Sequence, residues 1–294
     1  MSEFKTFNPF VNLAYFGFAA TFAMILKNPV CIIIGLVLSL SYSVMLGGAK
    51  TLKFNIFALL PLAVFGAVLN PLISHKGATI LCYLPSGNPL TKESVIYGAA
   101  ASGMIWCVVC LFSSFNKIMT SDKLMYAFGK IIPSLSLVFS MTLRFVPKFK
   151  ERIKAAAEAQ KGIGRAGTGG IIRRAKNGMK ILSIVITESL EGSIDTADSM
   201  KGRGFGTGSR TSFSNISFDK RDAFWLVLLL LLAAAIIFFA ASGAFYFRYF
   251  PDISKTPHTP QSAAAYFLYA IFCACPIIIE IKEGLRWKIL KSKI

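Results

Sequence analysis

The sequence predicts an all-α, polytopic membrane protein with about five to six transmembrane helices and three cytoplasmic or interfacial amphipathic helices. Of its 294 residues, 54% are hydrophobic and only 16% are charged, whereas an average soluble chain has roughly 25% charged residues. The mean hydropathy is +0.60. Apolar runs of spanning length also lie on both sides of a long basic segment, and a soluble protein of this size cannot bury so much apolar surface.

Six uncharged runs of 19 to 25 residues are long enough to cross a bilayer, which requires about 20 mainly apolar residues in a helix. These runs are 6–26, 28–49, 54–74, 94–116, 223–247 and 261–279. The last run has the least margin. A seventh run, 131–143, is shorter and contains Pro133, so it suits an interfacial helix better.

The basic charge predicts the topology. A net charge of +18 on a soluble protein would suggest nucleic acid, but in membrane proteins lysine and arginine gather on the cytoplasmic side, so we expect no nucleic-acid partner. With both termini in the cytoplasm, 27 of the 32 Lys and Arg residues lie on that side. The expected parts are a membrane part at 1–116, a cytoplasmic domain at 117–222, and a second membrane part with a basic tail at 223–294.

Two amphipathic helices are predicted inside this cytoplasmic domain. The first begins near Pro147, a suitable early helical residue, and ends at Gly162 and Gly164. The second, 172–201, would be roughly 45 Å long. Its apolar stripe has helical spacing and consists of Ala175, Met179, Leu182, Ile186, Leu190, Ile194, Ala197 and Met200. We expect the stripe to pack on the other cytoplasmic helix and against the membrane interior or interface.

A row of carboxylates lies on another face of the second helix, at Glu188, Glu191, Asp195 and Asp198. Paired carboxylates can act as general acid and base when their environments separate their pKa values. No histidine is near this row in the sequence, so we interpret it as a solvated or partner-facing surface. These carboxylates can also pair with Lys or Arg on the neighbouring helix.

Both predicted helices end in basic residues among glycines. Glycine just after a helix is the usual C-cap, and the helix dipole favours cations there. The first end contains Lys161, Gly162, Ile163, Gly164 and Arg165, and the second contains Lys201, Gly202, Arg203 and Gly204. These two glycine-flanked ends are the candidate partner-binding sites.

Nucleotide, cofactor and metal sites are not expected. Residues 162–167 match GxGxxG, but the glycines follow a helix instead of opening one after a strand. Phosphate is disfavoured at the negative end of a helix. Cys107 and Cys110 have CxxC spacing, but they lie within a predicted span with no histidine nearby, and we interpret them as small apolar fillers.

The insert and the preceding membrane part resemble a known family. MTLRFVPKFKERIKAAAEAQKGIG, followed by KILSIVITESLEGSIDTADSMKGRGFGTGSRTSF, resembles the transmembrane T component of energy-coupling factor (ECF) ABC transporters. The family includes the membrane subunit of cobalt and nickel uptake systems. The resemblance is close over about residues 140–212 and extends to NPLISHKG and GNPLTKESVIYG.

The resemblance implies a non-catalytic, energy-coupling subunit in a bacterial cell membrane. Its partners would be two ABC ATPase subunits and a membrane S component that binds a vitamin or a transition-metal ion. A first coupling helix would lie in the membrane plane at 121–136. The sequence Gly202-Arg203-Gly204 matches the small–Arg–Gly motif, whose arginine meets an acidic side chain of an ATPase. At the first end Ile163 stands in that position, and either Lys161 or Arg165 would supply the charge.

Two other classes are alternatives. A membrane-embedded enzyme acting on lipids would need ionisable groups clustered at membrane depth, and the six runs contain no Asp, Glu, His, Lys or Arg. A self-contained channel or carrier is disfavoured by the same lack of charged groups. The identity of the transported vitamin or metal, and whether the module is shared or dedicated, stay open.

Overall fold

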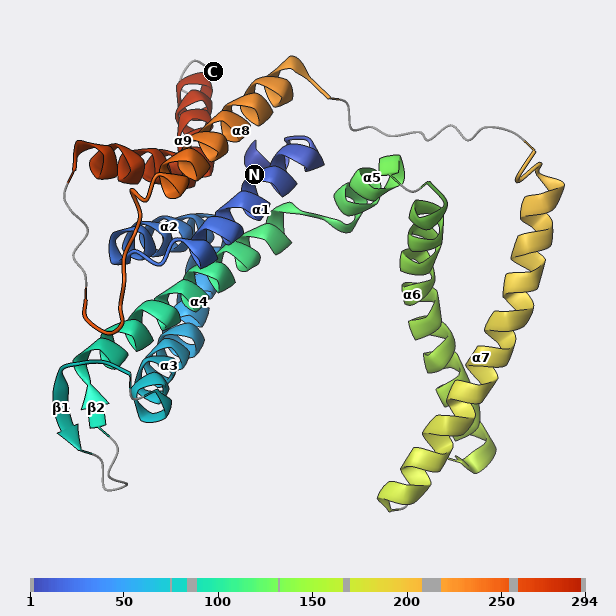
Figure 1. Cartoon of the computed structure of the whole chain (residues 1–294). Helices are drawn as coiled ribbons and strands as arrows, with labels where there is room; N and C mark the ends of the chain where they lie inside the picture. Colours follow the sequence, from blue (N-terminus) through green and yellow to red (C-terminus); the bar gives the residue numbers. More distant parts are fainter. Residues whose placement is uncertain are drawn as a thin grey trace. The chain divides into compact units, whose positions relative to one another are not determined.

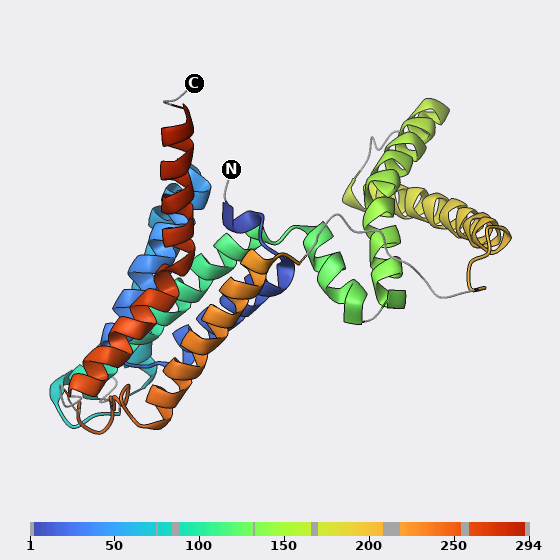
Figure 2. The same cartoon turned by 90° about the horizontal axis from the view of Figure 1, so that it is seen from above.

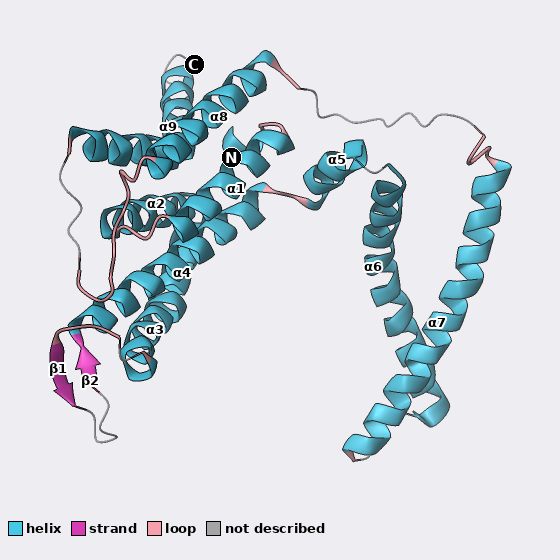
Figure 3. Ribbon diagram, in the orientation of Figure 1, coloured by secondary structure: helices cyan, strands magenta, loops and turns pink. Residues whose placement is uncertain are grey.

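The computed structural model describes residues 3–74, 76–83, 89–131, 133–165, 170–207, 218–253 and 259–291, and these are mostly helical (Figure 1). The helices are α1 (Pro9–Ile25), α2 (Pro29–Phe54), α3 (Leu60–Ile73), α4 (Lys92–Ile118), α5 (Ser121–Ile131), α6 (Pro133–Gln160), α7 (Ile171–Gly202), α8 (Lys220–Ala241) and α9 (Pro260–Lys291). The predicted all-α class is confirmed. An antiparallel hairpin, β1 (Ile80–Tyr83) with β2 (Pro89–Thr91), lies between α3 and α4 and was not predicted (Figure 3).

The contacts divide the chain into two compact units. The first unit contains residues 1–124 and 216–294, and the second contains residues 125–215. We call them the membrane unit and the insert unit, because every described stretch that is long and apolar enough to cross a membrane lies in the first.

Four helical stretches of the described chain are long and apolar enough to span a membrane: Pro29–Ile73, Lys92–Ile118, Lys220–Ala241 and Pro260–Arg286. The shorter Pro9–Ile25 is also apolar. The first stretch has 45 residues and is interrupted at Gly48, whose φ of 58° and ψ of −151° are not helical. A positive φ favours glycine. This break lies near the end of the second predicted run, 28–49, close to the lysines that separate it from the third. The chain is a multi-pass membrane protein.

Aromatic side chains dominate the core of the membrane unit. Tyr15 of α1 stacks on Phe272 of α9 with 5.5 Å between ring centres, and both rings are buried. The Tyr15 hydroxyl donates to the Cys273 carbonyl at 3.2 Å, which satisfies its polar end. α1 also packs against α4 and α8, and α8 lies beside α9 (Figure 2). The 17-residue α1 is therefore an integral part of this core.

Helices α3 and α4 approach each other closely through small residues. A Cβ built on Gly98 would lie 2.7 Å from the carbonyl oxygen of Ala67, and one built on Gly66 would lie 3.0 Å from Oγ of Ser102. Apolar contact between membrane helices gives no hydrophobic gain over lipid, so association depends on such close backbone approach. Gly98 is the position where any larger side chain must push the helices apart.

Polar contacts of the membrane unit gather at the ends of its helices in two sets. The first set comes from the N-terminal segment, the ends of α2 and α4, the starts of α5 and α8, and α9; it contains Glu3, Thr6, Thr51, Lys117, Lys123, Arg221 and Glu280. The second set contains Lys27, Asn28, Ser74, Thr79, Glu93, Ser94, Tyr249 and Tyr266. Along α1, α2, α3, α4, α8 and α9 the chain alternates between the two sets.

Two expectations for the start of the insert are wrong. Residues 121–136 do not form one helix, because α5 ends at Ile131 and Pro133 begins α6. The first long insert helix therefore starts at Pro133, and Pro147 lies inside it. The rule that proline suits the first helical position holds, but for the earlier proline. At this interior position Pro147 removes one helical hydrogen bond, and its ring crowds the carbonyl of Leu143.

A substitution at Gly98 tests the close packing of α3 and α4. Gly98→Ala should destabilise the protein by about 1–3 kcal/mol, as overpacking of a filled site typically does. Thermal unfolding in detergent micelles would show this as a lower Tm. Gly17→Ala is the matched control, because Gly17 lies in α1 with nothing within 4 Å of a built Cβ. Equal melting temperatures for the two variants would contradict the close α3–α4 packing.

Candidate functional site

The candidate site lies on the insert unit, where α6 and α7 cross as an X (Figure 1). Arg152 of α6 lies at the crossing. Its Nε is 3.5 Å from Oε1 of Glu188, and its Nη1 donates to the Glu188 carbonyl at 3.5 Å. The guanidinium also lies over Gly192, 3.8 Å from a Cβ built there. The expectation that the carboxylate row pairs with the neighbouring helix is confirmed for Glu188.

A cavity of about 210 Å³ lies at this crossing. Phenyl rings and cationic side chains come from α6, and hydroxyls and a glycine come from α7. The lining residues are Phe145, Lys148, Phe149, Arg152, Ser189, Gly192, Ser193 and Thr196. The side of α7 that meets α6 is therefore built of small and hydroxyl-bearing residues, with Val185, 4% exposed, as its one fully buried member among the described residues.

The apolar stripe of α7 is left uncovered by α6. Its large members are 50% to 72% exposed: Met179, Leu182, Ile186, Leu190 and Ile194. The prediction that this stripe packs on the other cytoplasmic helix is thus wrong. The physical reason is that α6 meets α7 on the face of Ser189, Gly192 and Thr196, where Arg152 lies over Gly192 and pairs with Glu188. The spacing of these small residues was the sequence signal for the contact. A contiguous exposed apolar surface of this kind marks an interaction site.

The end of α7 adopts a Schellman motif. The Phe205 N–H donates to the Met200 carbonyl at 3.0 Å, and the Gly204 N–H donates to the Lys201 carbonyl at 2.9 Å. This 6→1 and 5→2 pair requires a left-handed residue just past the C-cap, and Gly204 has a φ of 81°. Arg203 is the C-cap, and its side chain is exposed. Lys201 pairs along the helix with Asp198 at 3.9 Å.

The end of α6 has a similar backbone. Residues Lys161–Arg165 form a π-type turn, in which Gly164 has a φ of 73°. Ile163 thus precedes a left-handed glycine, as Arg203 does at the end of α7, and it is 68% exposed. Lys161 and Gly162 are exposed as well. The side chain of Arg165 lies outside the described part of the structure. Figures 1 and 2 show that the two glycine-flanked ends lie far apart on the crossed pair.

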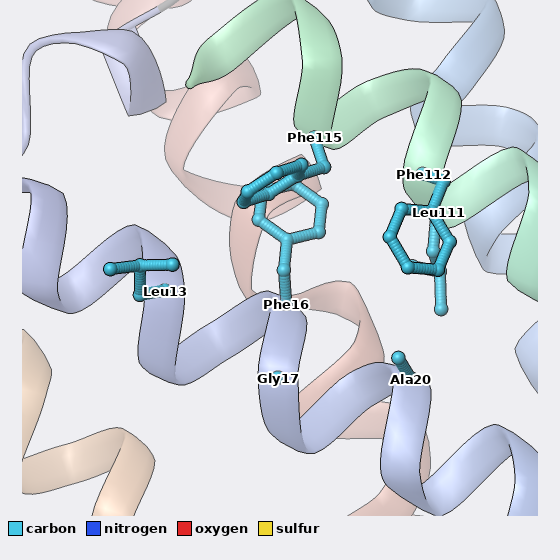
Figure 4. A pocket seen from close by; sticks show the side chains of 7 residues that line it. All are labelled: Leu13, Phe16, Gly17, Ala20, Leu111, Phe112 and Phe115. Atoms are coloured by element: carbon cyan, nitrogen blue, oxygen red, sulfur yellow. The ribbon is translucent and has the colours of Figure 1, made fainter. Parts of the chain in front are cut away.

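The membrane unit offers a different kind of cavity. About 190 Å³ lies between α1 and α4, and all of its lining side chains are apolar: Leu13, Phe16, Gly17, Ala20, Leu111, Phe112 and Phe115 (Figure 4). Such a surface suits an acyl chain or a helix, and its lining side chains carry no polar or ionisable group. Among the described residues no cluster of His, Cys, Asp and Glu could hold a metal ion. Cys107 and Cys110 are buried, with Cys107 accepting from the Ser39 hydroxyl at 3.5 Å.

Fold and site together define a multi-pass helical membrane protein that presents two long crossing amphipathic helices in a separate unit. A family model described as "Cobalt transport protein", CbiQ, matches residues 4–213. The chain belongs to this family.

Three relatives bear the name energy-coupling factor transporter transmembrane protein EcfT. The protein of Leuconostoc gelidum subsp. gasicomitatum is 33% identical over 96 residues, 32% of this chain and 36% of the relative. That of Lactobacillus helveticus is 34% identical over 93 residues, 31% of this chain and 34% of the relative. That of Brevibacillus brevis is 28% identical over 180 residues, 57% of this chain and 67% of the relative.

The matched regions span about a third of the length of the first two relatives and two thirds of the third. Together with the family match, they confirm the resemblance to the T component of ECF transporters.

A substitution at Gly204 tests the geometry of the α7 end. A side chain in the left-handed region costs about 1–2 kcal/mol, so Gly204→Ala should open the motif and speed hydrogen exchange at the Phe205 amide about tenfold. Gly202→Ala is the control, since Gly202 lies in the helix with nothing within 4 Å of a built Cβ. Unchanged exchange at Phe205 in Gly204→Ala would show that the motif is absent.

Proposed function

We propose that this chain is the energy-coupling membrane subunit of an ECF-type importer. It transmits ATP-driven motion from two ABC ATPase subunits to an S component that binds a vitamin or a transition-metal ion. ATP hydrolysis belongs to the partners, and the chain itself is non-catalytic. The proposal is supported by family membership, by the relatives' name, and by the separate unit of crossing amphipathic helices.

In this proposal residues 117–222 form the cytoplasmic coupling domain, between membrane parts 1–116 and 223–294. The protein lies in a bacterial cell membrane with both termini in the cytoplasm. The charge distribution supports this orientation, because it leaves 27 of 32 Lys and Arg residues on the cytoplasmic side. The first polar set, around Glu3, Lys123 and Arg221, then lies at the cytoplasmic ends of the spans.

The end of α7 carries the proposal. The Schellman motif fixes the backbone at Arg203, whose exposed side chain is accessible to a partner. Gly202 and Gly204 add no side chains around it, which lets a partner backbone approach. An arginine in this setting can form a charge-assisted, two-pronged contact with a carboxylate. We therefore assign the ATPase contact at this end to Lys201, Gly202, Arg203 and Gly204.

The end of α6 is assigned to the other ATPase subunit. Lys161, Gly162, Ile163, Gly164 and Arg165 form this surface, with Lys161 or Arg165 supplying the cation. Because Ile163 is exposed just before the left-handed Gly164, it meets the partner where Arg203 does at the other end. The two contacts then differ at the residue before the left-handed glycine, which is Arg203 at one end and Ile163 at the other.

The uncovered stripe of α7 is the proposed surface for the S component. Burying a Leu, Ile or Met side chain contributes about 1.5–3 kcal/mol, so covering the stripe's large members would favour association. Apolar contacts are also non-directional. A partner can therefore slide over this stripe as the ends of α6 and α7 are displaced by the ATPases.

Charge reversal at Arg203 tests the ATPase contact. Arg203→Glu should reduce co-purification of the ATPase subunits at least about tenfold, because it places like charges together at the interface. Arg173→Glu is the matched control, as it makes the same charge change on an exposed residue at the other end of α7. Retention of the ATPases by Arg203→Glu, or equal losses in both variants, would remove the main support for this contact.

Substitution of Ile163 tests the difference between the two ends. Ile163→Arg should tighten ATPase binding by about threefold to tenfold if the partner presents a carboxylate there as well, since a charge-assisted hydrogen bond replaces an apolar contact. Titration by surface plasmon resonance gives the affinity, and Ile163→Leu is the conservative control. Weaker binding of Ile163→Arg, with Ile163→Leu unchanged, would instead identify an apolar partner surface.

A further inference from the structure

A buried lysine holds the N-terminal segment. Lys123, 9% exposed, donates from its ammonium group to the carbonyl oxygens of Lys5 and, at 2.9 Å, of Phe7. With its amide oriented to satisfy both neighbours, the fully buried Asn12 accepts from Lys123 Nζ at 3.0 Å and donates to the Phe4 carbonyl at 3.2 Å. An ammonium group has three donors, and these three oxygens satisfy all of them.

The charge of Lys123 is balanced by the first turn of α8. Burial, together with the nearby charge of Lys5, lowers the pKa of Lys123 to about 8, and Asp222 opposes this shift. The ammonium is therefore still largely protonated at pH 7. Asp222 is itself buried and forms a capping box with Asp219. The start of α5, which carries Lys123, is thus electrostatically linked to the start of α8.

Arg221 binds the same N-terminal segment from the first turn of α8. Its Nη1 is 4.0 Å from Oε2 of Glu3, and its Nη2 donates to Oγ1 of Thr6 at 3.0 Å. The guanidinium carbon also lies 4.3 Å from the centre of the Phe7 ring. An exposed ion pair alone contributes little, but the hydrogen bond and the cation–π contact add to it.

The N-terminal segment is in turn anchored in the core of the membrane unit. Phe4 is buried and meets the ring of Tyr15 edge-on at 5.6 Å. The Glu3 N–H donates to Oε2 of Glu280 on α9 at 3.4 Å. Residues 3–8 therefore connect the helical core to two charged side chains, Lys123 and Arg221.

The positions of these two residues in the chain are informative. The chain leaves the membrane unit after Leu124 and returns to it at residue 216. We call α5 and the first turn of α8 the two connections of the insert unit, because they lie where the chain enters this unit and where it returns from it. Lys123 is on the first connection and Arg221 is on the second. Figure 2 shows the N-terminal turn beside the end of α4 and the start of α8.

We propose that residues 3–8 form a clasp that ties the two connections of the insert unit to each other and to α1. Lys123 and Arg221 are its positioning residues. A displacement of one connection is then passed, through residues 3–8, to the other connection and to the membrane core. This mechanical role of the N-terminal segment goes beyond the proposed function, and it does not depend on which partners bind.

Hydrogen exchange of the full chain in lipid nanodiscs tests the clasp. The reporters are the Leu124 amide, bonded to the Thr120 carbonyl at 3.1 Å, and the Ala223 amide, bonded to the Asp219 carbonyl at 3.0 Å. Lys123→Met leaves three oxygens without a donor, so it should speed exchange at Ala223 at least about tenfold. Arg221→Met should likewise speed exchange at Leu124. The expected result is this effect of each variant on the opposite connection.

The control is Lys5→Met, which removes an exposed cation of the same segment and keeps the backbone carbonyl that Lys123 binds. Its exchange at both reporters should match that of the unmodified chain. Because Arg221 is half exposed, Arg221→Met keeps the test decisive if Lys123→Met does not fold. An effect of each variant on its own connection alone would overturn the clasp.

A functional measurement separates this proposal from the proposed function. In the reconstituted transporter, Arg221→Met should keep the ATPase subunits bound but lower substrate uptake per ATP hydrolysed at least about threefold, whereas Arg203→Glu should lose the subunits. Unchanged uptake per ATP in Arg221→Met would overturn the clasp as a coupling element. Failure of the unmodified chain to bind ATPases would overturn the proposed function and leave the exchange result intact.

Discussion

The structure depends on keeping ionised groups out of the apolar interior of the membrane unit. A charged group at membrane depth is costly, so charged side chains lie just outside the uncharged runs, as Lys92, Lys117, Arg221 and Glu280 do. With the charges confined there, the middle of the unit is held by aromatic contacts and by the close approach of Gly98 to α3. The clasp follows from the same constraint. Lys123 is buried beside the spans, so its ammonium group requires hydrogen-bond acceptors, and the carbonyl oxygens of the N-terminal segment provide them.

The helical core was predictable from the long apolar runs. Lipid offers no hydrogen-bond partners, so the backbone of such a run must satisfy its own N–H and C=O groups by forming a helix. The break at Gly48 lies near the boundary between the second and third predicted runs. The start of α6 was missed because two prolines, Pro133 and Pro147, can both begin a helix by the same rule, and sequence does not rank them. The acceptors of Lys123 are mostly backbone carbonyls, which every residue carries, so no residue pattern could have identified them.

Helix α7 separates two requirements onto two faces. The face with Ser189, Gly192 and Thr196 meets α6, and the salt bridge between Arg152 and Glu188 lies at this crossing. The face with the larger apolar side chains is left for another surface. Amphipathic spacing correctly indicated that α7 has an apolar face to bury, but spacing alone does not say which neighbour buries it. Here the small residues, not the large ones, determine the contact within the chain.

The ends of α6 and α7 each contain a left-handed glycine and differ in the residue that precedes it. Each presents one residue just before a left-handed glycine, Arg203 before Gly204 and Ile163 before Gly164. A guanidinium requires a carboxylate at a defined distance and angle, whereas an isoleucine requires only an apolar surface of suitable shape. In the proposed function, Arg203 would therefore hold its partner directionally, whereas Ile163 would make a non-directional contact. Two ATPase subunits docked in this way would not be equivalent. A displacement of the partner at Arg203 would be passed to α7 through a directional contact, whereas the contact at Ile163 would let the partner slide relative to α6.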